Sequence, residues 1–149
     1  MRTKSHQARH LQAKLLIEEW KESERVRESV TWIQGKILYE LKKDNLYKYL
    51  YGGTQGDNNE RSWAWFLREI GIPSSTDQFK RSLYATWVLR LGYQPRQLTV
   101  HTRKLHRACG YVTKENAEEI LAQADALAFQ DFIEWLKEEK SPVGKDSVA

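Results

Sequence analysis

The chain lacks the features of secreted and membrane proteins. Cys109 is its one cysteine in 149 residues, which excludes an intrachain disulfide. No signal-like apolar segment follows Met1, and no stretch approaches the roughly 20 apolar residues that a membrane-spanning helix needs. A single cysteine without a signal segment favours a reducing compartment, so we expect an intracellular, cytoplasmic protein with no membrane partner.

Acidic residues are absent from the whole segment between Gln78 and Lys114. That segment carries eight basic residues: Lys80, Arg81, Arg90, Arg96, Arg103, Lys104, Arg107 and Lys114. The net charge of the chain is +4, so the remainder is acidic, mostly after Lys114. A clustered positive field attracts polyanions, which predicts a nucleic-acid partner. The alternative is a solvated basic face that balances the acidic C-terminal helices.

Arrangements of residues that would predict catalysis are absent as well. Cys109 has no identified base, and no pair of carboxylates lies in an apolar context that would raise a pKa. His101, His106 and Cys109 offer too few ligands for a structural zinc site, which usually needs four. We therefore expect a non-enzymatic protein with no catalytic residues, no metal and no cofactor.

The composition and the apolar spacing predict a folded, all-α protein. Apolar residues make up 40% of the chain and charged residues 30%, as in soluble globular domains. An amphipathic helix is indicated by apolar residues at spacings of three and four: Val26, Val30, Ile33, Ile37 and Leu41. It belongs to a long pattern over residues 6–43, whose charged stretch 21–28 either passes through solvent or bends. We expect a basic helical arm (residues 1–24), a compact multi-helix domain (25–140) and a disordered tail (141–149), with a glycine-rich loop at 51–59.

Two short helical patterns meet at a glycine in the middle of the chain. Residues 62–70 have one apolar side, Gly71 follows at a C-cap position, and a second helix runs to about Leu91. Ser75 and Gln78 have the spacing of a capping box at the start of that helix. This layout is typical of a helix-turn-helix, in which the second helix enters the major groove. Plain helical packing gives the same pattern and is the alternative.

The second helix of this unit has a polar side that suits DNA contact. Gln and Arg side chains pair with adenine and guanine edges, so Gln78 and Arg81 are the candidates for base contact. Lys80 is the candidate for phosphate contact. Short polar side chains complete the set: Ser74, Ser75 and Ser82. Asp77 falls where the motif has an apolar residue facing the first helix, and we expect it to serve the helix N-terminus instead.

The densest basic run lies further along, at residues 102–107. We expect one helix from about Pro95 to Cys109 and Thr113 as the cap of the next helix. The candidates for phosphate contact here are Arg96, Arg103, Lys104 and Arg107. They would bind duplex phosphates beside the second helix, or a single strand. A solvated helix face is again the alternative.

From Gln34 onward, over about two thirds of its length, the chain resembles a loose group of phage and mobile-element helical proteins. The resemblance rests on residues 35–41, 46–48 and 65–76, and on the later stretch 112–119 with Ala124 and Asp131. It implies a helix-turn-helix-like DNA-binding or regulatory role and brings no catalytic motif. The group usually has an apolar or aromatic pair where this chain has Asp77 and Gln78.

These patterns support two classes of function. The first is a DNA-binding regulator of a phage or mobile element, acting on double-stranded DNA as a homodimer. The second is a protein-interaction module, either a phage-encoded inhibitor with a host protein partner or a small helical subunit of an RNA-containing nucleoprotein complex. The second class predicts exposure of Trp20, Trp63 or Trp65, because interface hot spots favour tryptophan.

Overall fold

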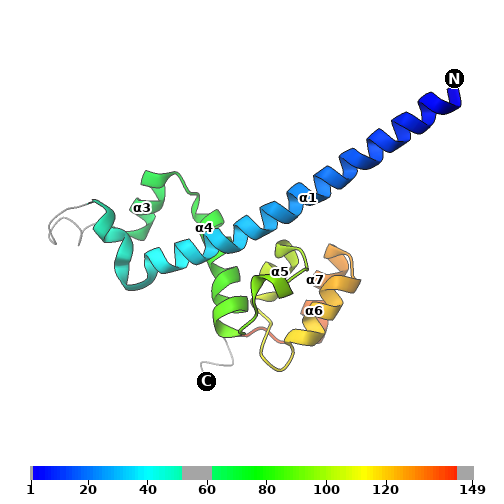
Figure 1. Ribbon diagram of the computed structural model, residues 1–149. Helices are drawn as coiled ribbons and strands as arrows, with labels where there is room; N and C mark the ends of the chain where they lie inside the picture. The colour runs from blue at the N-terminus through cyan, green and yellow to red at the C-terminus, as the bar shows by residue number, and fades with distance from the viewer. Residues whose placement is uncertain (1, 52–61, 144–149) are drawn as a thin grey trace.

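Helices and loops make up the part of the protein that the computed structural model describes, residues 2–51 and 62–143 (Figure 1). The elements in order are α1 (Arg2–Lys42), η1 (Lys43–Tyr51), α3 (Trp63–Ile70), α4 (Ser74–Leu83), η2 (Tyr84–Arg90), η3 (Pro95–Gln97), α5 (Thr102–Ala108), α6 (Ala117–Ala126) and α7 (Phe129–Glu139). These residues contain no strand, which confirms the all-α prediction. The glycine-rich loop and the tail expected from sequence fall mostly on residues 52–61 and 144–149, outside the described residues.

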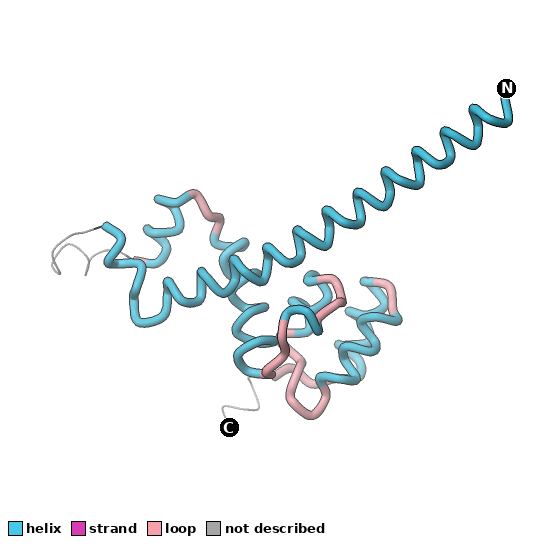
Figure 2. The backbone as a smooth tube through the Cα atoms, in the orientation of Figure 1, coloured by secondary structure: helices cyan, strands magenta, loops and turns pink. Residues whose placement is uncertain are grey.

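Helix α1 extends well beyond the rest of the protein. It runs without a break through residues 21–28, so this charged stretch does not bend, and it passes through solvent until Glu28 contacts the start of α5. Every described side chain from Ser5 to Ser23 is exposed, and Figures 1 and 2 show this end of α1 projecting away from the other helices. The helix also continues past the expected arm boundary at Glu24. Neither α1 nor any other described helix is both long and apolar enough to cross a membrane.

Two left-handed residues end α1, where the sequence pattern is interrupted. Asp44 and Asn45 have φ angles of 54° and 57°. Asn and Asp tolerate this conformation better than other non-glycine residues, because their short polar side chains bond locally. The chain reverses there into η1, which packs back on α1 and buries Tyr47.

Helix α4 crosses α1 at Gly35. This glycine is buried, and a Cβ atom built on it would lie 2.4 Å from the carbonyl oxygen of Lys80 and 3.2 Å from the Cβ atom of Tyr84. Real Cβ atoms do not approach a backbone oxygen so closely, so the absence of a side chain lets the two helices meet. Beside the crossing, the Lys80 ammonium donates a hydrogen bond to the side-chain oxygen of Gln34.

The helix-turn-helix-like pair corresponds to α3 and α4. Ser62 caps α3 by accepting a hydrogen bond from the Trp65 amide at 3.1 Å, and Gly71 ends it with a φ of 78°, as expected for a C-cap. Helix α4 continues without interruption into the π-helix η2, close to the predicted end at Leu91. The predicted capping box is wrong, because the N-cap of α4 is Pro73, two residues before Ser75, and no side chain caps the helix.

The single helix predicted from Pro95 to Cys109 is also wrong. One turn of 3-10 helix, η3, is followed by an irregular stretch, and α5 begins only at Thr102. Leu98 leaves the helical conformation (φ −101°, ψ 80°) and is buried in the core, so packing of this side chain breaks the helix. Thr113 accepts a hydrogen bond from the Asn116 amide in a turn, and α6 starts after Asn116 rather than at the predicted cap.

Among the described residues, two hydrophobic clusters form the core, and α1 contributes to both. The main core contains Trp32, Leu83, Trp87, Leu98, Leu105, Ala108, Val112, Ala117, Ile120, Ala124, Phe132, Ile133 and Leu136. The second core contains Leu38, Tyr47, Phe66 and Leu67, with Trp63 and Trp65 packed against it. Trp87 is fully buried, and its indole nitrogen donates to the Leu105 carbonyl at 3.0 Å. Helix α1 therefore connects α4–α7 with η1 and α3.

We expect the substitution Gly35→Ala to lower the free energy of unfolding by about 1–3 kcal/mol, the usual cost of an overpacked core. The clash with Lys80 outweighs the roughly 1 kcal/mol by which alanine favours a helix interior over glycine. Urea denaturation followed by circular dichroism measures the change. Gly110→Ala is the matched control, because a Cβ there meets no atom within 4 Å. Equal stability of the two variants would contradict a close crossing of α1 and α4.

Candidate nucleic-acid interface

A cleft with basic walls lies where α1, α4 and the start of α5 meet. Its volume is about 910 Å³, and its lining residues are Arg27, Glu28, Val30, Thr31, Ser75, Thr76, Phe79, Lys80, His101, Thr102 and Arg103. We call it the basic cleft. Among the predicted site residues, the fold brings Ser75, Lys80 and Arg103 together here. They are up to 28 positions apart in the sequence, so their proximity is a product of tertiary structure.

Positive charge dominates the basic cleft. Arg27, Lys80 and Arg103 line it, and Glu28 is the one acid among the lining residues. Glu28 is already engaged, since its carboxylate lies 3.1 Å from the Nε2 atom of His101 and accepts from the Thr102 amide at 3.3 Å. Glu28 therefore holds the start of α5 in place against α1, and its charge offsets one of the three positive charges of the basic cleft.

Arg27 and Arg103 of the basic cleft can both bind a phosphate. A phosphate can replace the contact that Arg27 makes, and it can bind Arg103 while the contact of Arg103 stays intact. Arg27 is 78% exposed and pairs with Glu24 at 3.6 Å, a surface ion pair worth at most about 1 kcal/mol. The guanidinium of Arg103 lies over the ring of Phe129, 4.4 Å from its centroid. A cation–π contact of this kind orients the guanidinium while its N–H groups remain able to donate to an anion.

The N-terminus of α4 opens beside the basic cleft. Ser74 and Ser75 occupy its first turn, both are exposed, and no side chain caps the helix. The first backbone N–H groups of a helix lack partners within the helix, and the macrodipole adds partial positive charge there. This end of α4 therefore adds to the attraction for anions that Lys80 and the arginines provide.

Helix α4 does not present a free face along its length. Gln78 is exposed, but every later residue up to Val88 is buried or half-buried, because α1 packs on one side and α5 on the other. Recognition helices of helix-turn-helix proteins lie in the major groove, which requires an open face. The side chains that α4 leaves accessible to a groove are therefore those of its start: Ser74, Ser75 and Gln78.

Arg81, a candidate for base contact, lies in an intramolecular ion pair instead. Its Nε and a terminal nitrogen donate to the Asp77 carboxylate at 2.9 and 2.7 Å, and the guanidinium lies 5.8 Å from the centre of the Trp63 ring. Asp77 is 1% exposed and also accepts from the Trp63 indole nitrogen at 3.0 Å. Asp77 thus does face the first helix of the pair, through hydrogen bonds, and it also lies in the first turn of α4, where the sequence predicted an acid that serves the helix N-terminus.

The other predicted residues are spread over the body. The Lys104 ammonium donates hydrogen bonds to the carbonyls of Ala124 and Leu127, at 2.7 and 2.6 Å, and so caps the C-terminal end of α6. Ser82 is half-buried, and Arg107 is exposed outside the basic cleft. Sequence reasoning missed Arg27, because nothing in the charged stretch of α1 indicates that it meets α4 and α5.

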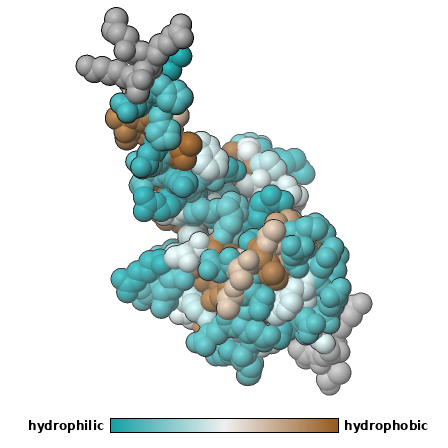
Figure 3. Space-filling view, turned by 90° about the vertical axis from the view of Figure 1, so that its right-hand side faces the viewer, coloured by the Kyte–Doolittle hydropathy of each residue, from teal (hydrophilic) through white to brown (hydrophobic). Residues whose placement is uncertain are grey.

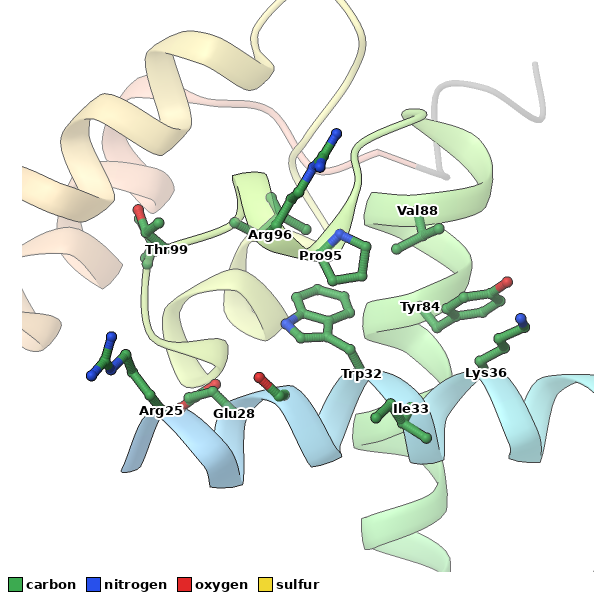
Figure 4. A pocket seen from close by; sticks show the side chains of 13 residues that line it. Arg25, Glu28, Trp32, Ile33, Lys36, Tyr84, Val88, Pro95, Arg96 and Thr99 are labelled. Carbon is green, nitrogen blue, oxygen red and sulfur yellow. The ribbon is translucent and has the colours of Figure 1, made fainter. Parts of the chain in front are cut away.

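Arg96 lines a second hollow, on the other side of Glu28 (Figure 4). This hollow of about 720 Å³ lies between α1, η2 and the segment after Pro95. Figure 4 shows Trp32 and Pro95 facing each other in its middle, with Arg25, Lys36 and Arg96 around them. Arg96 is thereby separated from Lys80 and Arg103, so the fold does not join all predicted phosphate contacts into one surface.

His101 lines the basic cleft, whereas Cys109 and His106 lie outside it. The Cys109 thiol is half-buried and lies 3.4 Å from the Leu105 carbonyl, and burial raises its pKa, which disfavours the reactive thiolate. Burial also lowers the pKa of His106, with a smaller contribution from the charge of Arg107. In residues 2–51 and 62–143, no three His, Cys, Asp or Glu side chains gather closely enough to hold a metal ion.

Comparison of the chain with protein-family models, with curated proteins and with solved structures found no match in any of the three. The resemblance to helical proteins of phages and mobile elements therefore stays a prediction.

We expect Asp77→Ala to lower the free energy of unfolding by about 3 kcal/mol, because it leaves the Trp63 indole and the Arg81 guanidinium without their acceptor. Asp77→Asn keeps an acceptor for the Trp63 indole, so we expect it to lower the free energy of unfolding by less than Asp77→Ala. Urea denaturation of the three proteins at neutral pH tests this order. Equal stability of all three would contradict a structural role for Asp77.

The same carboxylate predicts a pH dependence. Burial alone would raise the pKa of Asp77, but hydrogen bonds from Arg81 and Trp63 outweigh burial and hold the pKa below its usual value. A lowered folded-state pKa contributes stability above the unfolded-state value of about 3.9, and this contribution is lost as the pH falls toward the folded-state pKa. Below pH 4, the free energy of unfolding should therefore fall less steeply with decreasing pH in Asp77→Asn than in the unchanged protein.

Proposed function

We propose that the protein binds duplex DNA without catalysing a reaction and holds the phosphate backbone in the basic cleft. The observation that carries this proposal is the meeting of Arg27, Lys80 and Arg103, from three different helices, around one opening. Like charges repel, so a fold that gathers them around one engaged acid favours an anionic partner. The acid-free segment from Gln78 to Lys114 supplies two of the three charges.

The arrangement supports binding that is dominated by phosphate contacts. Lys80 and the two arginines donate to phosphate oxygens, and the exposed start of α4 adds backbone N–H groups. Base contact is limited to the first turn and a half of α4, where Gln78 is the longest exposed polar side chain. We therefore propose general affinity for duplexes with a modest sequence preference, and a regulatory role in a phage or mobile element as the resemblance implies.

Fluorescence anisotropy with random duplex DNA, single-stranded DNA and single-stranded RNA, from low to physiological salt, tests the proposal. We expect the duplex to bind best, with a log–log salt slope of about −3 or steeper for three or more neutralised phosphates. Arg27→Ala, Lys80→Ala and Arg103→Ala should each weaken binding to every duplex and reduce the slope by about 1.

Lys137→Ala is the matched control, because this lysine is exposed on α7 outside the basic cleft and carries the same charge. Gln78→Ala should change the preference among duplexes and leave the salt slope unaltered. Absence of binding to all three nucleic acids, or an effect of Lys137→Ala as large as that of Arg103→Ala, would reject the proposal. Tighter binding to single-stranded RNA would favour the nucleoprotein subunit instead.

A protein-interaction module is the second candidate, and α1 gives it specific support. Trp20 is 64% exposed, as this class of function predicts, whereas Trp63 and Trp65 are half-buried against the second core. An exposed tryptophan on a projecting helix is typical of a protein interface. Protein binding through α1 and DNA binding through the basic cleft use different surfaces, so both can operate in one molecule.

A further inference from the structure

The projecting end of α1 carries large apolar side chains that the protein itself does not cover. Leu16, Ile17 and Trp20 are 56%, 56% and 64% exposed. Figure 3 shows apolar atoms on this end of α1 among hydrophilic ones. Most helices in proteins are stabilised by packing of an apolar face rather than by intrinsic propensity, and this part of α1 packs no apolar face against the described residues. A partner that covers this face would stabilise it.

Six residues on this part of α1 form a pattern that reads the same in both directions. They are Arg9, Ala13, Leu16, Ile17, Trp20 and Glu24, with successive spacings of 4, 3, 1, 3 and 4. At about 100° per residue, all six fall within an arc of about 100° on one side of the helix. We call this arc the arm face. A second helix laid against it in the opposite direction would meet the same spacings.

We propose that the arm face binds the arm face of a second copy of this chain, with the two α1 helices antiparallel. The chemistry of the pattern is self-complementary in this orientation. Trp20 of each chain lies over Ala13 of the other, which pairs the largest side chain of the arm face with the smallest. Leu16 lies beside Ile17 at the centre, and Arg9 lies beside Glu24 at both ends.

Charge along α1 favours the antiparallel orientation over the parallel one. Before Glu18 the chain has four basic residues and no acid, whereas residues 18–24 contain four glutamates and one lysine. Antiparallel pairing about the point between Leu16 and Ile17 places the basic part of each helix against the acidic part of the other. Parallel pairing would place like charges together and stack Trp20 on Trp20, which costs stability.

The size of the contact suits a reversible dimer. The contact runs from Arg9 to Glu24, a length of about 24 Å at 1.5 Å per residue, and it stops before Arg27 and Glu28 of the basic cleft. Three large apolar side chains from each copy, with the stems of their neighbours, bury on the order of 1,000 Å², the lower end of specific interfaces. We therefore expect dissociation in the micromolar range rather than an obligate dimer.

The dimer also sets the distance between the two copies of the basic cleft. The consequence of this distance for DNA binding rests on the proposed function. Arg27 lies between 10 and 11 residues from the centre of pairing, so the two copies of Arg27 are about 32 Å apart along the helices. This separation is close to the 34–36 Å between half-sites one turn apart on duplex DNA. Two clefts at this spacing would engage phosphates on successive turns of one duplex.

Sedimentation velocity of the full chain without DNA, from micromolar to submillimolar concentration, tests the proposal. We expect a monomer–dimer equilibrium whose dissociation constant rises at least tenfold in Trp20→Ala. Leu11→Ala is the control, since Leu11 is 56% exposed on the same part of α1. It lies nine residues before Trp20, about 180° around the helix, and its loss should leave the dissociation constant unchanged.

A charge reversal tests the orientation. Arg9→Glu and Glu24→Arg should each weaken the dimer, and the two substitutions in one chain should restore it, because the antiparallel contact is then rebuilt with its charges exchanged. Parallel helices would give no such restoration. A monomer at every concentration, or a dimer lost in Leu11→Ala but kept in Trp20→Ala, would overturn the proposal. DNA binding by monomeric Trp20→Ala would show that the basic cleft is functional whatever the outcome for the dimer.

Discussion

The close crossing of α1 and α4 at Gly35 is the contact on which the other features depend. With no Cβ at this position, the backbone of α4 at Lys80 reaches the surface of α1. The crossing places Trp32 in the main core and Leu38, about two turns later, in the second core. It also brings Arg27 on α1 within reach of Lys80 on α4, so the basic cleft exists only because these helices meet. A larger residue at position 35 would separate the walls of the cleft as well as the cores.

The second determining feature is the hydrogen-bonded group of Trp63, Asp77 and Arg81. A helix-turn-helix pair normally packs through an apolar residue at the position of Asp77. Here the carboxylate replaces that contact with bonds to the Trp63 indole on α3 and to Arg81 on α4 itself. The consequence for function is direct, because Arg81 is no longer available to a base. The middle of α4 therefore packs within the fold, and the basic cleft lies beside α4 rather than along it.

Local rules were sufficient where the deciding interaction is local. The C-cap at Gly71 and the interruption at Asp44 and Asn45 depend on the conformational preferences of single residues. The long helical pattern at the N-terminus follows from apolar spacing. Local rules failed where a distant contact decides, as at Leu98, which breaks the predicted helix because its side chain enters the main core. Lys104 was expected on the surface, but it bonds to carbonyls at the C-terminal end of α6. No local pattern around residue 104 indicates this contact.

The sequence by itself determined the all-α class, a long helical pattern at the N-terminus, the acid-free basic segment and the self-complementary order of residues on the arm face. These properties follow from composition and periodicity, which depend on neighbours along the chain. Only the tertiary structure decided which basic side chains lie together. Arg27, Lys80 and Arg103 come together through helix crossings, whereas Arg81 and Lys104 are held by Asp77 and by two carbonyls of the chain. A charge is free or paired according to what folds against it, and that depends on contacts between residues far apart in sequence.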